Sequence, residues 1–125
     1  MTIRIIAHGD SDGVCSAAIA LAAFKEGEVF FSHPAGLLED LHEVYRSGDI
    51  VIVLDIALSQ PHLEKILETF EKIARTGKLI YIDHHPEPIG FNIRDLNGEI
   101  VHDTSCSTSE LSYFFFKNRL NHDMS

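Results

Sequence analysis

The stretch Leu79-Ile80-Tyr81-Ile82-Asp83-His84-His85 decides the fold that we expect for this chain. Its four apolar residues predict a buried strand, and a carboxylate and two imidazoles follow that strand directly. Two earlier apolar runs end in the same way: residues 3–7 lead into His8, and residues 50–54 lead into Asp55. Open α/β sheets bind ligands at the carboxyl ends of their strands. The sequence therefore predicts a ligand site where these three strands end.

Segments with apolar residues at helical spacing alternate with the strands, which indicates repeated βαβ units and a parallel sheet. The additional strands are short, at residues 29–31 and 100–101. The predicted helices follow residue 12, cover residues 37–44 and 63–74, and run from 107 to 118. We expect an α/β fold: a three-layer doubly wound sheet, mostly parallel, with about five strands and helices on both faces. Residues 1–125 form a single domain in this interpretation.

The periodicity also predicts which side chains are buried. On the first helix the expected apolar face consists of Val14, Ala17, Ala18, Leu21 and Ala22, and on the last helix of Leu111, Phe114 and Phe115. Cys15 and Cys106 are too few for a disulfide framework, so we expect them to be small core residues.

Composition limits the classes of partner. The net charge is −9 at pH 7, and there is no run of lysine or arginine, so the chain lacks the electrostatic means to bind long nucleic acid. Any phosphate substrate would need metal ions to bind. The start of the chain lacks the form of a signal peptide, and no apolar run approaches the roughly 20 residues that span a bilayer. We expect a soluble cytoplasmic protein with no membrane partner.

The residue types at the strand ends favour hard divalent cations. Mn²⁺ prefers carboxylate oxygens and tolerates imidazole, and the set is rich in aspartate with no cluster of thiolates, so manganese is favoured over zinc. Asp55 follows a strand that is apolar throughout and therefore central. From that position it is expected to bridge two ions, so that a phosphoryl group would be attacked by water with no protein nucleophile.

Each of these residues also has a structural interpretation. Asp12 precedes a helix and could serve only as its N-cap, and Asp55 could cap a turn. Ser105 and Ser107 are placed to cap the last helix, where the run 107–110 fits a capping box, although amides at a helix start also bind phosphate. Acids and histidines at three strand ends together nevertheless favour one shared site.

The ordered set His8-Gly9-Asp10-Ser11-Asp12-Gly13, then Asp55, then Asp83-His84-His85 resembles the first three motifs of the DHH phosphoesterases. That family includes RecJ-type single-strand exonucleases, oligoribonucleases, cyclic-dinucleotide phosphodiesterases and manganese inorganic pyrophosphatases. The resemblance implies a hydrolase that cleaves phosphodiester or phosphoanhydride bonds of nucleotides or short oligonucleotides. The implied mechanism uses two metal ions and attack by water, with Mn²⁺ as the cofactor and Mg²⁺ or Co²⁺ as alternatives.

The resemblance also implies roles for individual residues. The implied metal ligands are His8, Asp10, Asp12, Asp55, Asp83 and His84. Asp55 and His85 would be catalytic, and His85 and Ser105 would contact the substrate phosphate. Asp83 would be either a further ligand or a partner that orients a histidine. His8 precedes Asp10 by two positions, whereas the family's histidine often precedes it by four.

The chain departs from the family pattern near its end. The last metal-binding aspartate of the family usually lies beyond the helix that residues 107–118 resemble, and Asp103, better suited to capping, is the nearest substitute. We therefore expect the N-terminal domain of a longer two-domain enzyme, with little activity alone and with homodimerisation through the aromatic last helix as an alternative. The competing interpretation is a binding or regulatory module that retains the fold but is catalytically impaired. A nucleotide-binding domain is disfavoured because no glycine-rich loop follows the first strand. The expected partner is a phosphate-containing small molecule or a short single-stranded nucleic acid.

Overall fold

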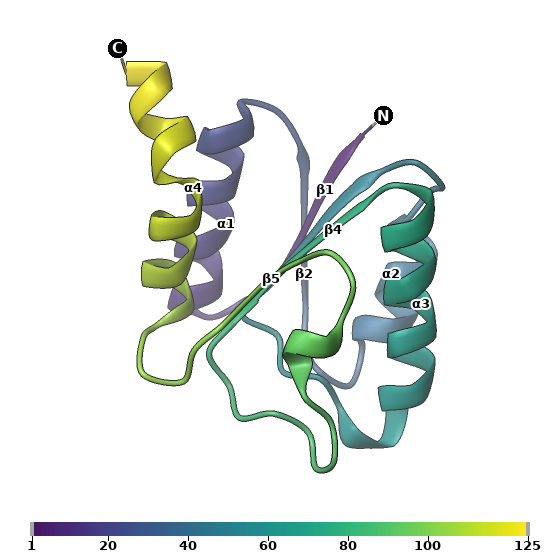
Figure 1. Cartoon of the computed structure of the whole chain (residues 1–125). Coiled ribbons are helices and arrows are strands. Elements are labelled where there is room, and N and C mark those ends of the chain that lie inside the picture. Colours follow the sequence, from purple (N-terminus) through teal and green to yellow (C-terminus); the bar gives the residue numbers. More distant parts are fainter. Residues whose placement is uncertain (1, 125) are drawn as a thin grey trace.

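Five strands form one sheet in the computed structural model, which describes residues 2–124 without the side chains of residues 119 and 121–124 (Figure 1). In chain order the strands are β1 (Ile3–His8), β2 (Glu28–Ser32), β3 (Ile50–Leu54), β4 (Lys78–Asp83) and β5 (Glu99–His102). The spatial order is β2-β1-β3-β4-β5, and every neighbouring pair is parallel. The predicted doubly wound α/β sheet is confirmed, with β3 at its centre.

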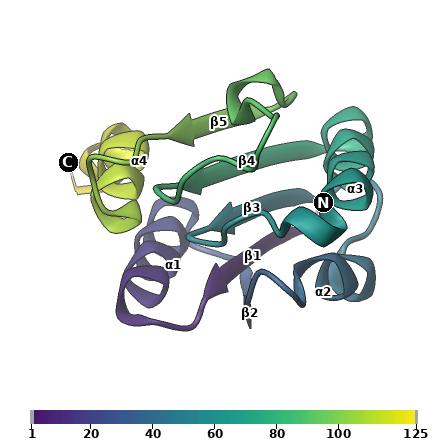
Figure 2. The same cartoon turned by 90° about the horizontal axis from the view of Figure 1, so that it is seen from below.

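Four helices cover the two faces of this sheet (Figure 2). They are α1 (Ser11–Phe24), α2 (Leu37–Val44), α3 (Leu63–Thr76) and α4 (Thr108–Met124), with short 3-10 turns at Gln60–His62 and Ile93–Asp95. α1 and α4 lie on one face, and α2 and α3 lie on the other. This arrangement gives the three layers that the alternation of strands and helices predicts.

The strands are buried on both faces because successive side chains point in opposite directions. On β3, Val51 and Val53 pack toward α2 and α3, while Ile52 and Leu54 pack toward α1 and α4. Each of these side chains is buried, and complete burial of such a residue contributes roughly 1.5–3 kcal/mol. The two-sided core fixes the strand register, and so it fixes which residues emerge at the carboxyl ends.

The predicted buried face of α1 is wrong except at Ala17. Of its five residues only Ala17 is buried; Val14 is 45% exposed and Leu21 is 37% exposed, and Ala18 and Ala22 are exposed as well. The buried residues of α1 are Gly13, Ser16, Ala17, Ala20 and Ala23. Apolar residues surround nearly the whole of α1, so periodicity alone does not select a face, and small side chains allow the close packing of α1 against α4. Cys15 is exposed as well, contrary to the expectation that it lies in the core.

The prediction for α4 is half right. Leu111 is buried, but Phe114 is 59% exposed, and Phe116 takes its place in the core at 3% exposure. Phe116 packs edge-on against Phe24 of α1, with ring centroids 5.9 Å apart. The contact with α1 therefore sets the orientation of α4, which the spacing of three consecutive phenylalanines leaves open.

None of the helices in the described part of the chain has the length and the apolar content that a membrane span requires.

Candidate metal centre

The predicted site residues lie at the carboxyl ends of three strands that are direct neighbours in the sheet. In the register, Ala7 of β1 pairs with Leu54 of β3, and Leu54 pairs with Ile82 of β4. The residues that follow these three positions are His8, Asp55 and Asp83. Parallel strands end at the same edge, so the structure brings the three predicted motifs together at that edge.

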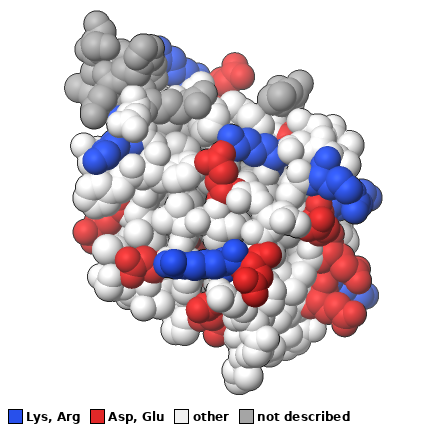
Figure 3. All heavy atoms as spheres, in the orientation of Figure 1, with Lys and Arg blue, Asp and Glu red and all other residues white. Residues whose placement is uncertain are grey.

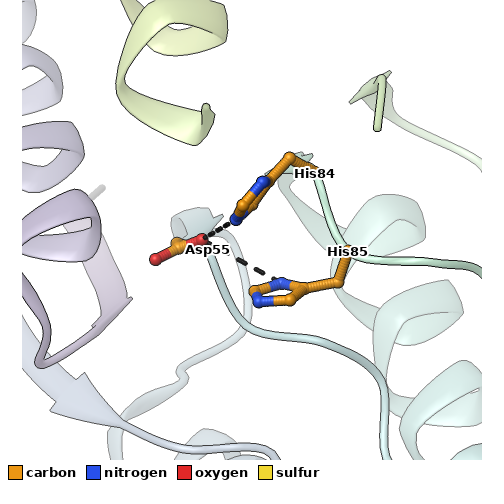
Figure 4. Close-up of side chains that lie close together, drawn as sticks. All are labelled: Asp55, His84 and His85. Carbon is orange, nitrogen blue, oxygen red and sulfur yellow. Dashed lines mark ion pairs between the residues drawn. The ribbon is translucent and has the colours of Figure 1, made fainter. Parts of the chain in front are cut away.

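Asp55 lies at the centre of this group. Its side chain is 1% exposed, and its Oδ1 atom accepts a hydrogen bond from the Thr108 hydroxyl at 3.0 Å. The Nε2 atom of His84 lies 3.2 Å from the same oxygen (Figure 4). The Oδ2 atom of Asp55 is buried and has no hydrogen-bond partner among the described residues. A buried carboxylate oxygen without a donor is costly, and a cation is one group that would compensate it.

The backbone of Asp55 is in the left-handed region, with φ of 62°. Few residues other than glycine adopt this conformation, and aspartate is among those that tolerate it. Two hydrogen bonds support the turn: the Asp55 amide donates to the Ile82 carbonyl at 3.0 Å, and the Tyr81 hydroxyl donates to the Ile56 carbonyl at 2.8 Å. The surrounding structure thus imposes an unusual conformation on the residue that occupies the middle of the site.

Two groups of side chains offer sets of ligand atoms that could bind an ion. His8, Asp10 and Asp55 form one group, and Asp55, His84 and His85 form the other, with the ligand atoms of each group within 4.8 Å of one another. Asp55 belongs to both groups. This arrangement fits a carboxylate that bridges two ions, which is the role expected for Asp55.

The electrostatics of the acids fit the same arrangement. Burial raises the pKa of Asp55 to about 6, and the nearby Asp10 carboxyl adds to the rise. The Gly13 amide lowers the pKa of Asp10, which therefore stays ionised beside Asp55. Two carboxylates at such a site must share either a proton or a cation. The donor set consists of oxygen and imidazole nitrogen, so it fits a hard divalent metal.

Asp10 and Asp12 both make capping contacts, but only one of them caps its own helix. Asp10 is the N-cap of α1 and accepts the Gly13 amide at 2.9 Å. Asp12 instead accepts the amides of Thr108 and Ser109 in the first turn of α4, at 3.1 and 2.8 Å. Burial opposes ionisation of Asp12, but these amides outweigh it and lower its pKa. A carboxylate oxygen has two lone pairs and can accept more than one contact, so capping leaves positions for a metal.

Gly13 is required for this geometry. A Cβ atom at Gly13 would lie 1.9 Å from the carbonyl oxygen of His8, whereas a Cβ at Gly9 would meet nothing within 4 Å. The first turn of α1 therefore approaches the end of β1 more closely than any side chain permits. This contact positions Asp10 and Asp12 relative to His8.

Asp83 is turned toward His85. It is fully buried, and its Oδ1 atom lies 2.7 Å from Nδ1 of His85. Its Oδ2 atom accepts the His85 amide and the Tyr81 hydroxyl, both at 3.2 Å. Of the two roles considered for Asp83, this geometry corresponds to orienting a histidine. Burial opposes protonation of His85, but Asp83 outweighs it and raises the pKa of His85.

Asp103 and Ser105 lie in the turn before α4. The Asp103 Oδ1 atom accepts the Ser105 amide at 2.8 Å and the Ser105 hydroxyl at 2.6 Å. Asp103 belongs to neither of the two groups of ligand atoms, and the contacts of Ser105 are with Asp103 and Cys106. Ser107 and Glu110 form the predicted capping box, in which the Ser107 hydroxyl accepts the Glu110 amide at 3.2 Å.

Comparison with known families matches the chain to the DHH family, N-terminal domain, over residues 2–125. The chain belongs to the DHH family. Membership of the DHH family points to metal-dependent phosphoester chemistry and to a hydrolase as the general class of protein. It agrees with the motifs quoted above, all of which lie at the carboxyl edge of β1, β3 and β4.

The fold of this DHH chain resembles the crystal structure of an uncharacterized protein from Helicobacter pylori G27. The TM-score is 0.62 and the sequence identity is 17%, over 94% of this chain and 37% of the Helicobacter chain. The DHH chain thus spans little more than a third of that neighbour, and at this identity the likeness shows the fold alone. Comparison with curated proteins gives no match.

Sequence reasoning missed three residues that support the DHH site. Thr108 contacts Asp55, Tyr81 contacts Asp83, and His102 lies with Nε2 2.6 Å from the carbonyl oxygen of His85. The strand pattern assigns Tyr81 only to the core, and nothing in the pattern distinguishes Thr108 from the serines beside it. For Tyr81, the hydroxyl on a core-facing strand residue is a feature of the sequence that could have indicated a contact, because a buried hydroxyl needs a hydrogen-bond partner.

Proposed function

We propose that this protein is a metal-dependent phosphoesterase that hydrolyses phosphodiester or phosphoanhydride bonds of nucleotides or short oligonucleotides. The observation that carries the proposal is the position of Asp55, which is buried, shared by two groups of ligand atoms, and has one carboxylate oxygen without a donor. Membership of the DHH family supports the class of reaction.

The metal in this proposal is a pair of Mn²⁺ ions, with Mg²⁺ or Co²⁺ as alternatives. His8, Asp10 and Asp55 would bind one ion. Asp55 and His84 would bind the other together with Asp12, whose Oδ2 atom lies 3.5 Å from Nε2 of His84, and His85 would remain available for substrate. Divalent ions at such a site supply charge neutralisation for the phosphoryl oxygens and a nucleophile derived from water. Oxygen and imidazole donors without thiolates suit these ions better than they suit zinc.

His85 has a separate role in this proposal. Its Nδ1 atom faces Asp83, which leaves Nε2 for a substrate. Asp83 raises the pKa of His85 although burial opposes this, and a protonated imidazole would donate a hydrogen bond from Nε2 to a phosphoryl oxygen. Asp83 keeps the ring in this orientation through contacts to both its Nδ1 atom and its backbone amide.

The surface charge favours a small substrate. Figure 3 shows lysine and arginine side chains separated by acidic ones on the face drawn, with no continuous basic surface there among the described residues. The net charge of −9 likewise opposes binding of a long polyanion. We therefore propose that the substrate is a phosphate-containing small molecule or a short single strand in preference to long nucleic acid. We also propose the cytoplasm as the compartment.

A catalytically impaired binding module is the second candidate, favoured by the position of Asp103. This acid is the nearest substitute for the last metal-binding aspartate of the DHH pattern, and it lies outside both groups of ligand atoms. In that case the protein would bind Mn²⁺ and a phosphate compound without turnover.

Hydrolysis of bis-p-nitrophenyl phosphate and of a dinucleotide, with Mn²⁺ and with EDTA, tests the proposal. We expect turnover that requires metal, and a loss of roughly 100- to 1000-fold in kcat for His85→Gln with Mn²⁺ binding retained. Mn²⁺ binding without turnover of any phosphoester would support the binding module instead. Turnover that persists in EDTA would contradict both.

A further inference from the structure

Thr108, the first residue of α4, makes two contacts with the candidate metal centre. Its side chain is fully buried, and its hydroxyl lies 3.0 Å from Oδ1 of Asp55. Its backbone amide lies 3.1 Å from Oδ2 of Asp12. One residue therefore contacts two of the expected metal ligands, and those ligands come from two other elements of the fold.

The direction of the hydroxyl contact is fixed by chemistry. An ionised carboxylate only accepts hydrogen bonds, so the Thr108 hydroxyl donates to Asp55. This contact occupies Oδ1 of Asp55 and leaves Oδ2 as the oxygen without a partner. Three features restrict the rotamer of Asp55: its left-handed backbone conformation, the contact with His84 and the hydrogen bond from Thr108.

The neighbouring hydroxyl groups do not replace this contact. The Ser107 hydroxyl contacts Glu110, and the Ser109 hydroxyl contacts Ser107 at 3.1 Å. Ser105 contacts Asp103. Of the hydroxyls in this Ser- and Thr-rich turn, only that of Thr108 contacts Asp55.

We propose that Thr108 is a positioning residue that holds Asp55 and Asp12 in the geometry needed to bind metal. This inference rests on the proposed function, because it assigns Thr108 a role in the same site. A positioning role differs from a purely structural role of Thr108 in the first turn of α4. If the role were purely structural, loss of the hydroxyl would change the stability of the fold but not the affinity for metal.

The test uses three substitutions at one position and one at a distance. Thr108→Val keeps the shape of the side chain without its hydroxyl, Thr108→Ala is a smaller variant in case valine prevents folding, and Thr108→Ser keeps the hydroxyl. Thr69→Val is the matched control, since Thr69 is also buried but donates within α3 to the Lys65 carbonyl. Mn²⁺ affinity is measured by calorimetry, Mn²⁺ EPR reports the environment of the ions, and denaturation without metal verifies folding.

We expect Thr108→Val and Thr108→Ala to bind Mn²⁺ roughly 10- to 100-fold more weakly than the wild type, with altered EPR spectra. Thr108→Ser should restore wild-type affinity, and Thr69→Val should not change it. Equal affinity in the wild type and in Thr108→Val or Thr108→Ala would overturn the inference, as would failure of the serine to restore binding. If the wild type itself bound no Mn²⁺, the proposed function would fail, and this inference with it.

Discussion

The Asp12 carboxylate accepts the backbone amide of Ser109 at 2.8 Å, although the two residues lie 97 positions apart in the sequence. An acid in the first turn of α1 therefore caps α4, the helix beside it. Both helices begin at the carboxyl edge of the sheet, so their positive ends lie beside the cluster of acids. The link makes the arrangement of the site depend on the packing of α1 against α4.

Substitution of Asp12 should affect stability through this cap. We expect Asp12→Ala to lower the free energy of unfolding by about 1–2 kcal/mol, because two amides of α4 lose a charged acceptor. Urea denaturation of the metal-free protein measures the effect. Ser11→Ala, at the exposed start of α1, serves as the control and should change stability little. Unchanged stability of Asp12→Ala would show that solvent caps α4 equally well.

Gly13 and Gly9 provide a matched pair of alanine substitutions. Gly13→Ala should destabilise the protein by several kcal/mol or displace the first turn of α1, since the new Cβ would overlap the His8 carbonyl. Gly9→Ala should be tolerated because the corresponding space is open. Thermal denaturation and Mn²⁺ affinity check both variants. Equal behaviour of the two would contradict the close contact between β1 and α1.

Asp55 should reduce the stability of the metal-free protein at neutral pH. Its pKa rises from 3.8 to about 6 on folding, so the native state binds more protons than the unfolded state between these values. Stability is therefore greater below about pH 4 and falls as pH rises through 6. The cost of ionisation is about 3 kcal/mol, so Asp55→Asn should be more stable than the wild type at pH 7 by an amount of that order.

Urea denaturation between pH 4 and pH 8 without metal tests this expectation. The informative quantity is the difference between wild type and Asp55→Asn, because other acids titrate in both proteins. The difference should grow as pH rises from 4 to 7. A difference that is constant with pH would mean that the pKa of Asp55 does not rise on folding.

Asp49 should show the opposite dependence on pH. It is buried at the other end of β3, with Oδ2 3.0 Å from Nε of Arg4. Burial opposes its ionisation, but Arg4 and the amides of Arg46 and Thr2 outweigh it and lower its pKa below 3.8. Its contribution is present above pH 3.8 and is lost as pH falls below that value. We expect Asp49→Asn to cost about 2 kcal/mol at pH 7, because the charged acceptor for Arg4 is lost, and to leave Mn²⁺ affinity unchanged; denaturation and calorimetry measure the two quantities. A change in Mn²⁺ affinity would contradict the assignment of the metal site to the carboxyl edge alone.

The sequence was sufficient to predict the strands and the edge at which the motifs meet. Strand residues such as Ile52 and Ile80 lie in apolar runs, and the acids and histidines follow those runs directly, so parallel pairing brings them together. The buried face of α1 could not be predicted, because a helix with apolar residues on every side packs according to its neighbours. The contacts of Asp12 and Thr108 were also hidden, since they depend on how closely α4 approaches α1.

The central claim is that Asp55 is the shared ligand of a two-ion site, and titration of Mn²⁺ by calorimetry into wild type and Asp55→Asn tests it most directly. Asp103→Asn is the matched control, as an acid at a neighbouring strand end that lies outside both groups of ligand atoms. We predict two Mn²⁺ ions per wild-type chain, the same for Asp103→Asn, and loss of both ions from a stably folded Asp55→Asn. Undiminished binding in Asp55→Asn, or no Mn²⁺ binding by the wild type, would contradict the claim.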